Sequence, residues 1–177
     1  PCPEFVHLDA EVKTAPFGNY AWCWGIFGDS IAKKLNVPVM IFNAGWAGSA
    51  MFNWQESIDP NATTVSTFGN PYPTGLPFGH MRLALNYYIA QQGYRAVLWH
   101  QGEADNFIEN SREGYRNGLR SIIEASRSLS GKPNLAWVVA RASRFTKDGN
   151  SRIWQPVIDA QNDVIGVNGS DPNLVLP

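Results

Sequence analysis

Residues 99–106, WHQGEADN, place several polar side chains directly after the apolar run RAVL. Gln101 carries an amide N–H donor at the expected end of a buried strand, where a donor can stabilise an oxyanion. Glu103 and Asp105 are acceptors that can fix the loop backbone or neighbouring side chains. The segment therefore predicts an oxyanion donor with two acids close to it.

His100 is the only histidine in this segment. If the strand continues through it, its side chain points away from that of Gln101. We expect His100 to be a structural hydrogen-bonding residue, with catalysis as the alternative. Two acids near a histidine also suggest a metal site, but no second histidine or cysteine stands at ligand spacing, so we expect no metal.

A second segment, NAGWAGSAMFNW at residues 43–54, contains glycines at positions 45 and 48. These glycines permit a tight turn and bring backbone N–H groups close to a ligand, as oxyanion stabilisation requires. Gly48, which is followed by Ser49, is the better candidate. The alternative is that the two glycines only shape a turn after a strand.

The tryptophans that flank Gly48, Trp46 and Trp54, are candidates for sugar binding together with Ser49. An indole face can stack on the C–H face of a sugar, although most tryptophans lie in protein cores. Both interpretations stay open for these two residues.

Alternating strands and helices must position these segments. Short apolar runs predict buried strands at 38–43, 95–100, 134–140 and, after the last helix, 173–176. Helical spacing predicts helices at 24–36, 80–92, 110–131 and 156–165. In the third helix, Asn110 is the expected N-cap, with Glu113 three residues later, and Gly131 ends the helix.

This order predicts an α/β fold in which helices cover a parallel sheet through right-handed connections. Ligands then bind at the carboxyl ends of the strands, where both polar segments lie. The stretch 59–78, rich in Pro, Gly, Thr and Asn, is expected to be a long loop at the rim of the site. We see neither a repeat nor a linker, so we expect one domain over residues 1–177.

Composition is that of a globular domain, with 177 residues that are 44% hydrophobic and 16% charged. The formal net charge of −1 and the dispersed charges give no footprint of nucleic-acid or membrane-surface binding. No apolar run approaches the ~20 residues of a membrane span, and the chain does not open with a signal-peptide pattern. Cys2 and Cys23 are expected to be ordinary buried residues, with a disulfide left open.

The segments NVPVMIFNAGWAGSAMFNW and, about forty residues later, VLWHQGEADN resemble the sialate O-acetylesterase and carbohydrate acetylesterase branch of the SGNH (GDSL-like) hydrolases. The resemblance extends to YRNGLRSIIEASR and NLAWVVARAS. It implies a three-layer α/β/α sandwich with a parallel central sheet, of flavodoxin-like type. It also implies an esterase without a cofactor that acts on an acetylated carbohydrate, and it favours a secreted or periplasmic location.

In that family a serine in a Gly-Gln-Ser-Asn segment attacks an acetyl ester, and an Asp-x-x-His pair supplies the base. Carried over by position, Gly48 matches the second-block glycine and Gln101 the oxyanion donor of the third block. Glu103 and Asp105 match supporting acids. The chain lacks both Gly-Gln-Ser-Asn and Asp-x-x-His, so we expect it to be the middle of an esterase domain, incomplete at both ends and without a complete triad.

The tripeptide GDS at residues 28–30 is the one after which GDSL hydrolases are named. Ser30 lies only 18 residues before Gly48, which leaves room for the rest of a helix and one strand. A nucleophile turn needs a strand before it and a helix after it, whereas AWCWGIF fits an amphipathic helix equally well. We therefore expect Ser30 to be a helix-surface or helix-cap residue, with a nucleophile as the alternative.

Two functions from different classes follow. The first is a serine esterase that removes O-acetyl groups from a carbohydrate of the sialic acid or plant polysaccharide type through an acyl-enzyme. The second is a carbohydrate-binding or interaction domain that keeps the fold without catalysis. The sequence does not fix the sugar or the oligomeric state.

Overall fold

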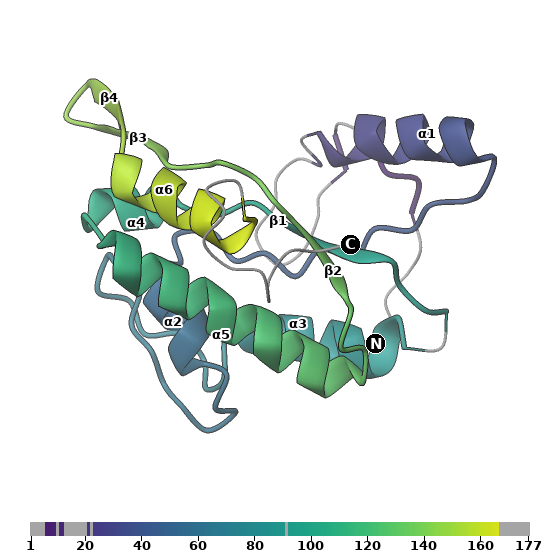
Figure 1. Cartoon of the computed structure of the whole chain (residues 1–177), viewed down its shortest axis with the longest axis horizontal. Helices are drawn as coiled ribbons and strands as arrows, with labels where there is room; N and C mark the ends of the chain where they lie inside the picture. Colours follow the sequence, from purple (N-terminus) through teal and green to yellow (C-terminus); the bar gives the residue numbers. More distant parts are fainter. Residues whose placement is uncertain (1–5, 10, 13–20, 22, 91, 167–177) are drawn as a thin grey trace. The chain divides into compact units, whose positions relative to one another are not determined.

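The computed structural model describes residues 6–9, 11–12, 21, 23–90 and 92–166. The chain divides into two compact units, Pro1–Ala47 and Gly48–Pro177, and each is described by itself (Figure 1). Cys2 and the strand predicted at residues 173–176 lie outside the described residues.

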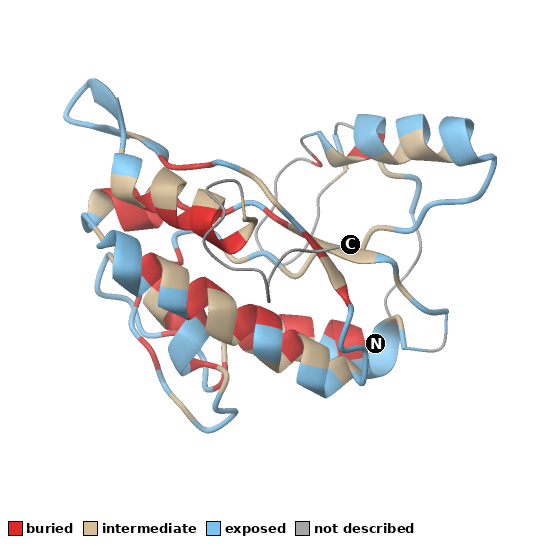
Figure 2. Cartoon of the chain, viewed as in Figure 1, coloured by how far each residue is buried: buried red, intermediate tan, exposed pale blue. Residues whose placement is uncertain are grey.

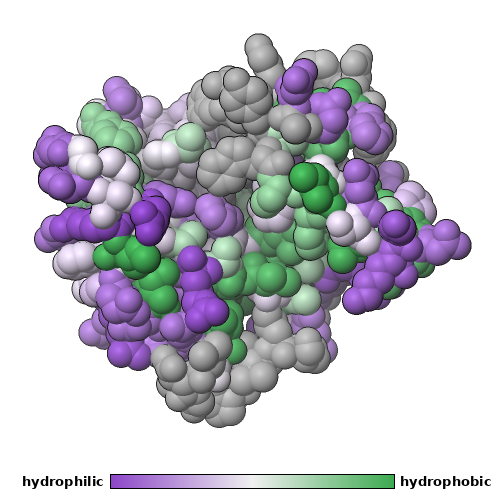
Figure 3. All heavy atoms as spheres, turned by 90° about the horizontal axis from the view of Figure 1, so that it is seen from above, coloured by the Kyte–Doolittle hydropathy of each residue, from purple (hydrophilic) through white to green (hydrophobic). Residues whose placement is uncertain are grey.

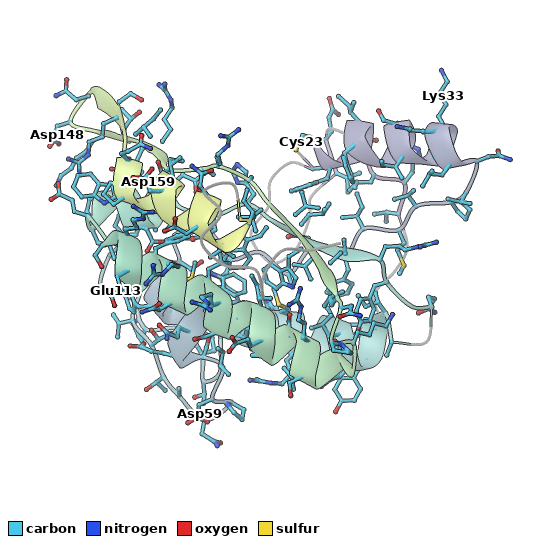
Figure 4. All side chains as sticks on the ribbon, in the orientation of Figure 1. Cys23, Lys33, Asp59, Glu113, Asp148 and Asp159 are labelled. Carbon is cyan, nitrogen blue, oxygen red and sulfur yellow. The ribbon has the colours of Figure 1, made fainter. Side chains whose placement is uncertain are left out.

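The first unit contains helix α1, Trp24–Leu35, as the sequence predicts. Lys33 and Lys34 lie in its last turn, where positive charge suits the helix dipole, and Asn36 ends it with a left-handed backbone, φ 52° (Figure 4). Ser30 lies within this helix, and its Oγ donates to the Ile26 carbonyl at 2.8 Å. The prediction that Ser30 belongs to a helix is confirmed.

Two predictions for the first unit are wrong. Residues 38–43 form no strand, and Val39 and Met40 are exposed rather than buried. An extended segment becomes a strand only when a neighbour completes the hydrogen-bond ladder, and no described residue pairs with 38–43. Cys23 precedes α1 and is an exposed free thiol, so it is not a core residue.

The second unit contains a small parallel sheet. Strand β1, Ala96–Trp99, pairs with β2, Ala136–Val139, in a register that runs from Ala96 opposite Ala136 to Trp99 opposite Val139. Both strands were predicted at these positions. Together with the surrounding helices, the parallel pair places the chain in the α/β class.

Two helices connect β1 to β2. The short α4, Glu103–Phe107, begins directly after the strand, and α5, Arg112–Ser130, is the longest helix described. The N-cap of α5 is Ser111, whose side chain accepts from Gly114 N–H at 3.0 Å, and not Asn110 as predicted. Asn110 stands one position before the cap, and its Nδ2 donates to Asp105 Oδ1 at 2.7 Å.

The predicted apolar stripe of α5 forms the centre of the core. The stripe is almost completely buried (Figure 2) and consists of Tyr115, Leu119, Ile122 and Ile123. The helix packs against α2, Met51–Glu56, and α6, Gln155–Val164, the latter close to its predicted bounds. A Cβ at Gly118 would lie 2.5 Å from Met51 Cγ, so a larger residue there would force the buried Met51 side chain to move.

The predicted helix at residues 80–92 forms in two parts. Helix α3, Phe78–Leu83, continues into a π-helical turn, η1, Ala84–Tyr88, which closes with the Ile89 N–H donating to the Ala84 carbonyl. The helix therefore ends earlier than predicted, before Gly93.

A hairpin follows β2 and was not predicted. Strands β3, Arg144–Lys147, and β4, Asn150–Ile153, pair antiparallel around Asp148 and Gly149, whose φ values of 51° and 77° are those of a tight hairpin turn. Asp148 lies at the far end of the hairpin (Figure 4). An Asp-Gly pair between short segments is a hairpin signal that could have identified it.

Three tryptophans pack against one another inside the second unit, one pair edge to face and the other tilted. The rings of Trp54 and Trp99 have centroids 5.1 Å apart, and those of Trp99 and Trp137 are 5.6 Å apart. Each ring is nearly inaccessible to solvent. They join α2 to both strands of the parallel sheet.

The surface mixes hydrophilic and apolar residues, as the face seen in Figure 3 shows. Several large apolar side chains of the second unit are exposed, among them Phe68, Tyr87 and Val138. Within the described residues, no helix has the length and apolar character needed to cross a membrane.

Candidate functional site

The two polar segments singled out in the sequence meet in the second unit. Gln101, which follows β1, donates from Nε2 to the Ser49 carbonyl oxygen at 3.0 Å, although the two residues are 52 positions apart. Ser49 immediately precedes the N-cap of α2, and Gln101 is 8% exposed. The structure thus fixes Gln101 beside the Gly48–Ser49 turn.

Gly48 occupies the outer side of this turn. Its φ of +75° lies in the left-handed region, which a side chain disfavours, so the turn itself requires glycine. The residue is exposed, and its N–H donates to no acceptor among the described residues. A backbone donor in this state can bind the oxygen of an incoming ligand.

Asp105 connects the start of α2 to Gln101 through its buried carboxylate. Its fully buried carboxylate accepts from Met51 N–H at 2.9 Å, from Asn110 Nδ2 at 2.7 Å and from Gln101 Nε2. The contact with Met51 binds one of the backbone donors that a helix leaves unpaired at its start. Asp105 therefore holds both the start of α2 and Gln101.

Burial controls the ionisation of this carboxyl. Desolvation raises the pKa of Asp105, and the hydrogen bonds from Gln101, Asn110 and the Met51 backbone oppose that rise. The nearby charge of Glu103 adds to it. The ionised form is thus stabilised by its three donors against the removal of water.

Both N–H groups of the Gln101 side-chain amide already donate hydrogen bonds within the protein. One Nε2 hydrogen serves the Ser49 carbonyl and the other serves Asp105. Its Oε1 is buried and has no hydrogen-bond partner in the described part of the chain. Donation from Gln101 to an oxyanion would require an exchange of one of these two hydrogen bonds.

The backbone around Gln101 is equally constrained. Its carbonyl accepts from the Tyr115 hydroxyl at 2.8 Å and from Gln161 Nε2 at 3.1 Å. Gln161 also binds both the N–H and the carbonyl of Ala142, so it ties the segment after β1 to the segment after β2. Desolvation raises the pKa of the buried Tyr115 hydroxyl, which stays a neutral donor.

Gly102 makes this close approach possible. Its φ is +156°, and a Cβ built on it would lie 1.8 Å from the Ala142 carbonyl oxygen. Such a distance excludes any side chain. Glycine is required at position 102 because the segment after β1 passes close to the segment after β2 at Ala142.

Glu103 and His100 lie at the edge of this arrangement. Glu103 Oε1 is 3.8 Å from His100 Nδ1, and both side chains are more than a third exposed. Glu103 makes none of the hydrogen bonds described for Asp105. Its role as a supporting acid stays a prediction.

The residues predicted to bind a sugar do not share one surface, since Trp54 and Ser49 are buried in the second unit and Trp46 belongs to the first. Trp54 is 3% exposed, and its Nε1 donates to Ser49 Oγ at 2.8 Å. Because the ring is enclosed by the core, it presents no face to a sugar, and Ser49 is buried with it. Trp46 belongs to the first unit, and sugar binding by it stays a prediction.

Two buried asparagines that the sequence analysis did not single out support the site. Asn53 accepts from Ala50 N–H and donates to Thr64 Oγ1 at 2.6 Å, which ties α2 to the loop that follows it. Asn106 accepts from Arg152 Nε at 2.9 Å and so holds the hairpin. Asn53 follows the N-cap by three positions, a spacing that could have identified it as a capping residue.

The predicted loop at residues 59–78 lies beside the Gly48 turn. Thr67 Oγ1 donates to the Gly48 carbonyl at 3.4 Å, and the ring of Phe68 lies next to the Gly48 Cα. This loop therefore borders exposed Gly48. As for metals, the described residues contain no group of three or more His, Cys, Asp or Glu side chains that could hold an ion.

The geometry is that of a glycine turn and a glutamine brought together beyond the carboxyl end of a parallel strand, the place where α/β enzymes bind ligands. The family model described as "SASA: Carbohydrate esterase, sialic acid-specific acetylesterase" matches residues 6–173. The chain belongs to this carbohydrate esterase family. Neither the curated proteins nor the solved structures include a match.

Proposed function

We propose that this chain forms part of a carbohydrate O-acetylesterase that works through an acyl-enzyme. The observation that carries the proposal is the hydrogen bond from Gln101 to Ser49, which brings the WHQGE segment to the Gly48 turn. Exposed Gly48 directly precedes Ser49, the residue that this amide side chain contacts. Membership of the carbohydrate esterase family supports an acetylated carbohydrate as substrate.

The reaction follows from the charge that develops on the ester. A serine hydroxyl attacks the acetyl carbonyl carbon, a histidine takes the hydroxyl proton, and the carbonyl oxygen becomes an oxyanion. Gly48 N–H donates to that oxygen. When the carbonyl re-forms, the bond to the sugar oxygen breaks, and the histidine returns the proton to the sugar. Water then releases acetate from the serine by the same steps.

Gln101 has two parts in this proposal. It holds the Ser49 carbonyl and so fixes the orientation of the Gly48 turn, and its amide is the second oxyanion donor once the substrate displaces one of its present partners. Asp105 keeps the amide nitrogen turned toward the turn. Glu103, which is partly exposed, is proposed as a further supporting acid.

We further propose that the complete domain is a three-layer α/β/α sandwich of SGNH type, of which residues 1–177 form one part. Neither Gly-Gln-Ser-Asn nor Asp-x-x-His occurs in the sequence, so the nucleophile and the dyad are proposed to come from other segments of the protein. Sialic acids and plant polysaccharides are the proposed carriers of the acetyl group.

The test is acetate release by the protein that carries this chain. An O-acetylated sialic acid and an acetylated xylan are offered in parallel, and a serine-directed fluorophosphonate probe followed by peptide mapping locates the nucleophile. We expect acetate from at least one substrate and labelling of a serine other than Ser30. Binding of sugars without acetate release or probe labelling would instead support a carbohydrate-binding domain.

A further inference from the structure

Three phenylalanines form a row on the second unit. The centroids of Phe68 and Phe107 are 5.3 Å apart, and those of Phe107 and Phe145 are 5.5 Å apart. They come from the loop before α3, from α4 and from β3. We call these three residues the phenylalanine row. An aromatic row at a surface is a common feature of ligand sites.

Phe68 is the member of the row that faces solvent. Its side chain is 58% exposed, whereas Phe107 and Phe145 are partly buried. Lys147 Nζ lies 5.0 Å from the centroid of Phe107 and occupies a face of that ring. The ring that remains accessible to a ligand is therefore that of Phe68.

Several hydrogen bonds brace the loop that carries Phe68. Ser66 Oγ accepts from the N–H groups of Phe68 and Asn70, and Ser66 N–H donates to the Asn70 carbonyl at 2.8 Å. The start of the loop is anchored by buried Asn53, whose Nδ2 donates to the Val65 carbonyl at 2.8 Å. An exposed ring on a preorganised loop loses little conformational entropy when it binds.

Phe68 is also adjacent to the proposed oxyanion donor. A Cβ built on Gly48 would lie 3.5 Å from Phe68 Cε2, and the neighbouring Thr67 Oγ1 donates to the Gly48 carbonyl. The ring and the Gly48 peptide are thus in contact range. An ester bound through its carbonyl at Gly48 would bring its alcohol part next to this ring.

From this geometry we infer that Phe68 is a substrate-binding residue on which the sugar ring of the acetyl ester stacks. The inference rests on the proposed function, since it takes the acetyl carbonyl to bind at Gly48. The C–H face of a pyranose packs on the exposed face of Phe68, while the acetyl group reaches the turn. Phe68 then distinguishes sugar acetates from acetates of small alcohols.

Phe68→Ala tests this inference with two substrates, an O-acetylated methyl glycoside and ethyl acetate. We expect kcat/KM for the glycoside to fall about two- to tenfold, the scale of one aromatic contact, through KM rather than kcat. The value for ethyl acetate should stay unchanged. Phe68→Trp should keep the preference for the glycoside. Tyr87→Ala, which removes an exposed ring from η1, is the matched control and should change neither value.

Ligand-observed NMR with the corresponding non-acetylated methyl glycoside separates this inference from the proposed function. Phe68-dependent binding by a protein that releases no acetate would overturn the esterase and keep the sugar site. Hydrolysis of both esters with equal losses, or with none, in Phe68→Ala would overturn the sugar site and keep the esterase. Absence of glycoside binding by the unaltered protein would also overturn the sugar site. Thermal unfolding of each variant shows whether a loss of activity reflects a loss of folded protein. If Phe68→Ala is unstable, Phe68→Leu takes its place, since it keeps an apolar side chain but lacks the ring that the sugar would stack on.

Discussion

Gln101 and Ser49 are joined by a 3.0 Å hydrogen bond from a side-chain amide to a backbone carbonyl. Ser49, the residue that carries this carbonyl, directly follows Gly48. Gln101 therefore helps to hold the turn that contains Gly48, and a change at Gln101 should disturb that turn as well.

Gln101→Ala should lower the turnover of an aryl acetate by roughly 10²-fold, the scale of one lost oxyanion donor. It should also reduce the free energy of unfolding by about 1–3 kcal/mol, because Asp105 and the Ser49 carbonyl lose a donor. Steady-state kinetics and chemical denaturation measure the two effects. Gln155→Ala, at the exposed start of α6, should change neither. Unchanged turnover in Gln101→Ala would remove Gln101 from the site.

Asp105 should make stability depend on pH. Burial raises the pKa of Asp105 in the folded chain above the ordinary value of about 3.9, which applies to the unfolded chain. At a pH between the unfolded and the folded pKa, the folded chain therefore binds more protons than the unfolded chain. Stability should then fall as pH rises through that window, by about 1.4 kcal/mol for each unit of pKa elevation. Asp105→Asn does not titrate and should lack this decrease.

The measurement for Asp105 is the difference in unfolding free energy between the unaltered chain and Asp105→Asn, taken by urea denaturation from pH 4 upward. The unaltered chain should lose stability relative to the variant as pH increases. A relative gain for the unaltered chain at higher pH would contradict the raised pKa.

Gly102→Ala should destabilise the chain by more than about 3 kcal/mol or prevent folding, because the new Cβ would overlap the Ala142 carbonyl. Gly149→Ala is a matched comparison, since Gly149 also has a positive φ, 77°, but has open space around it. It should lose only about 1–2 kcal/mol. Calorimetry of both variants separates overlap from backbone strain, and equal losses would show that overlap is unimportant.

Ser30→Ala should leave acetate release by the protein within about threefold of its original rate, as expected for a residue outside the reacting centre. The Ser30 hydroxyl binds its own helix at Ile26. Labelling by the serine-directed probe should persist in the variant. Loss of nearly all activity together with the label would identify Ser30 as the nucleophile.

Local patterns predicted much of the second unit. The stripe from Tyr115 to Ile123 and the runs around Ala96 and Ala136 led to α5 and both parallel strands, because burial of an apolar face decides those elements. The run at 38–43 has the same composition but forms no strand. Strand formation depends on a partner, which composition does not reveal.

Hydrogen-bond partners were harder to predict than residue types. The sequence indicated that Gly48 and Gln101 belong together, but not that both amide hydrogens of Gln101 are used by Ser49 and Asp105. It also left Trp54 open between core and sugar site, and the structure places it in the core. Contacts between residues fifty positions apart depend on the packed fold, which spacing alone does not determine.

The contacts among the rings of Trp54, Trp99 and Trp137 have an optical consequence. Indoles at centroid separations of 5.1 and 5.6 Å are close enough for their electronic transitions to couple. The folded chain should therefore show an exciton couplet in its far-ultraviolet circular dichroism. Because Trp99 is the shared partner in both pairs, its replacement by phenylalanine should abolish the couplet, whereas a change at either outer ring should only weaken it.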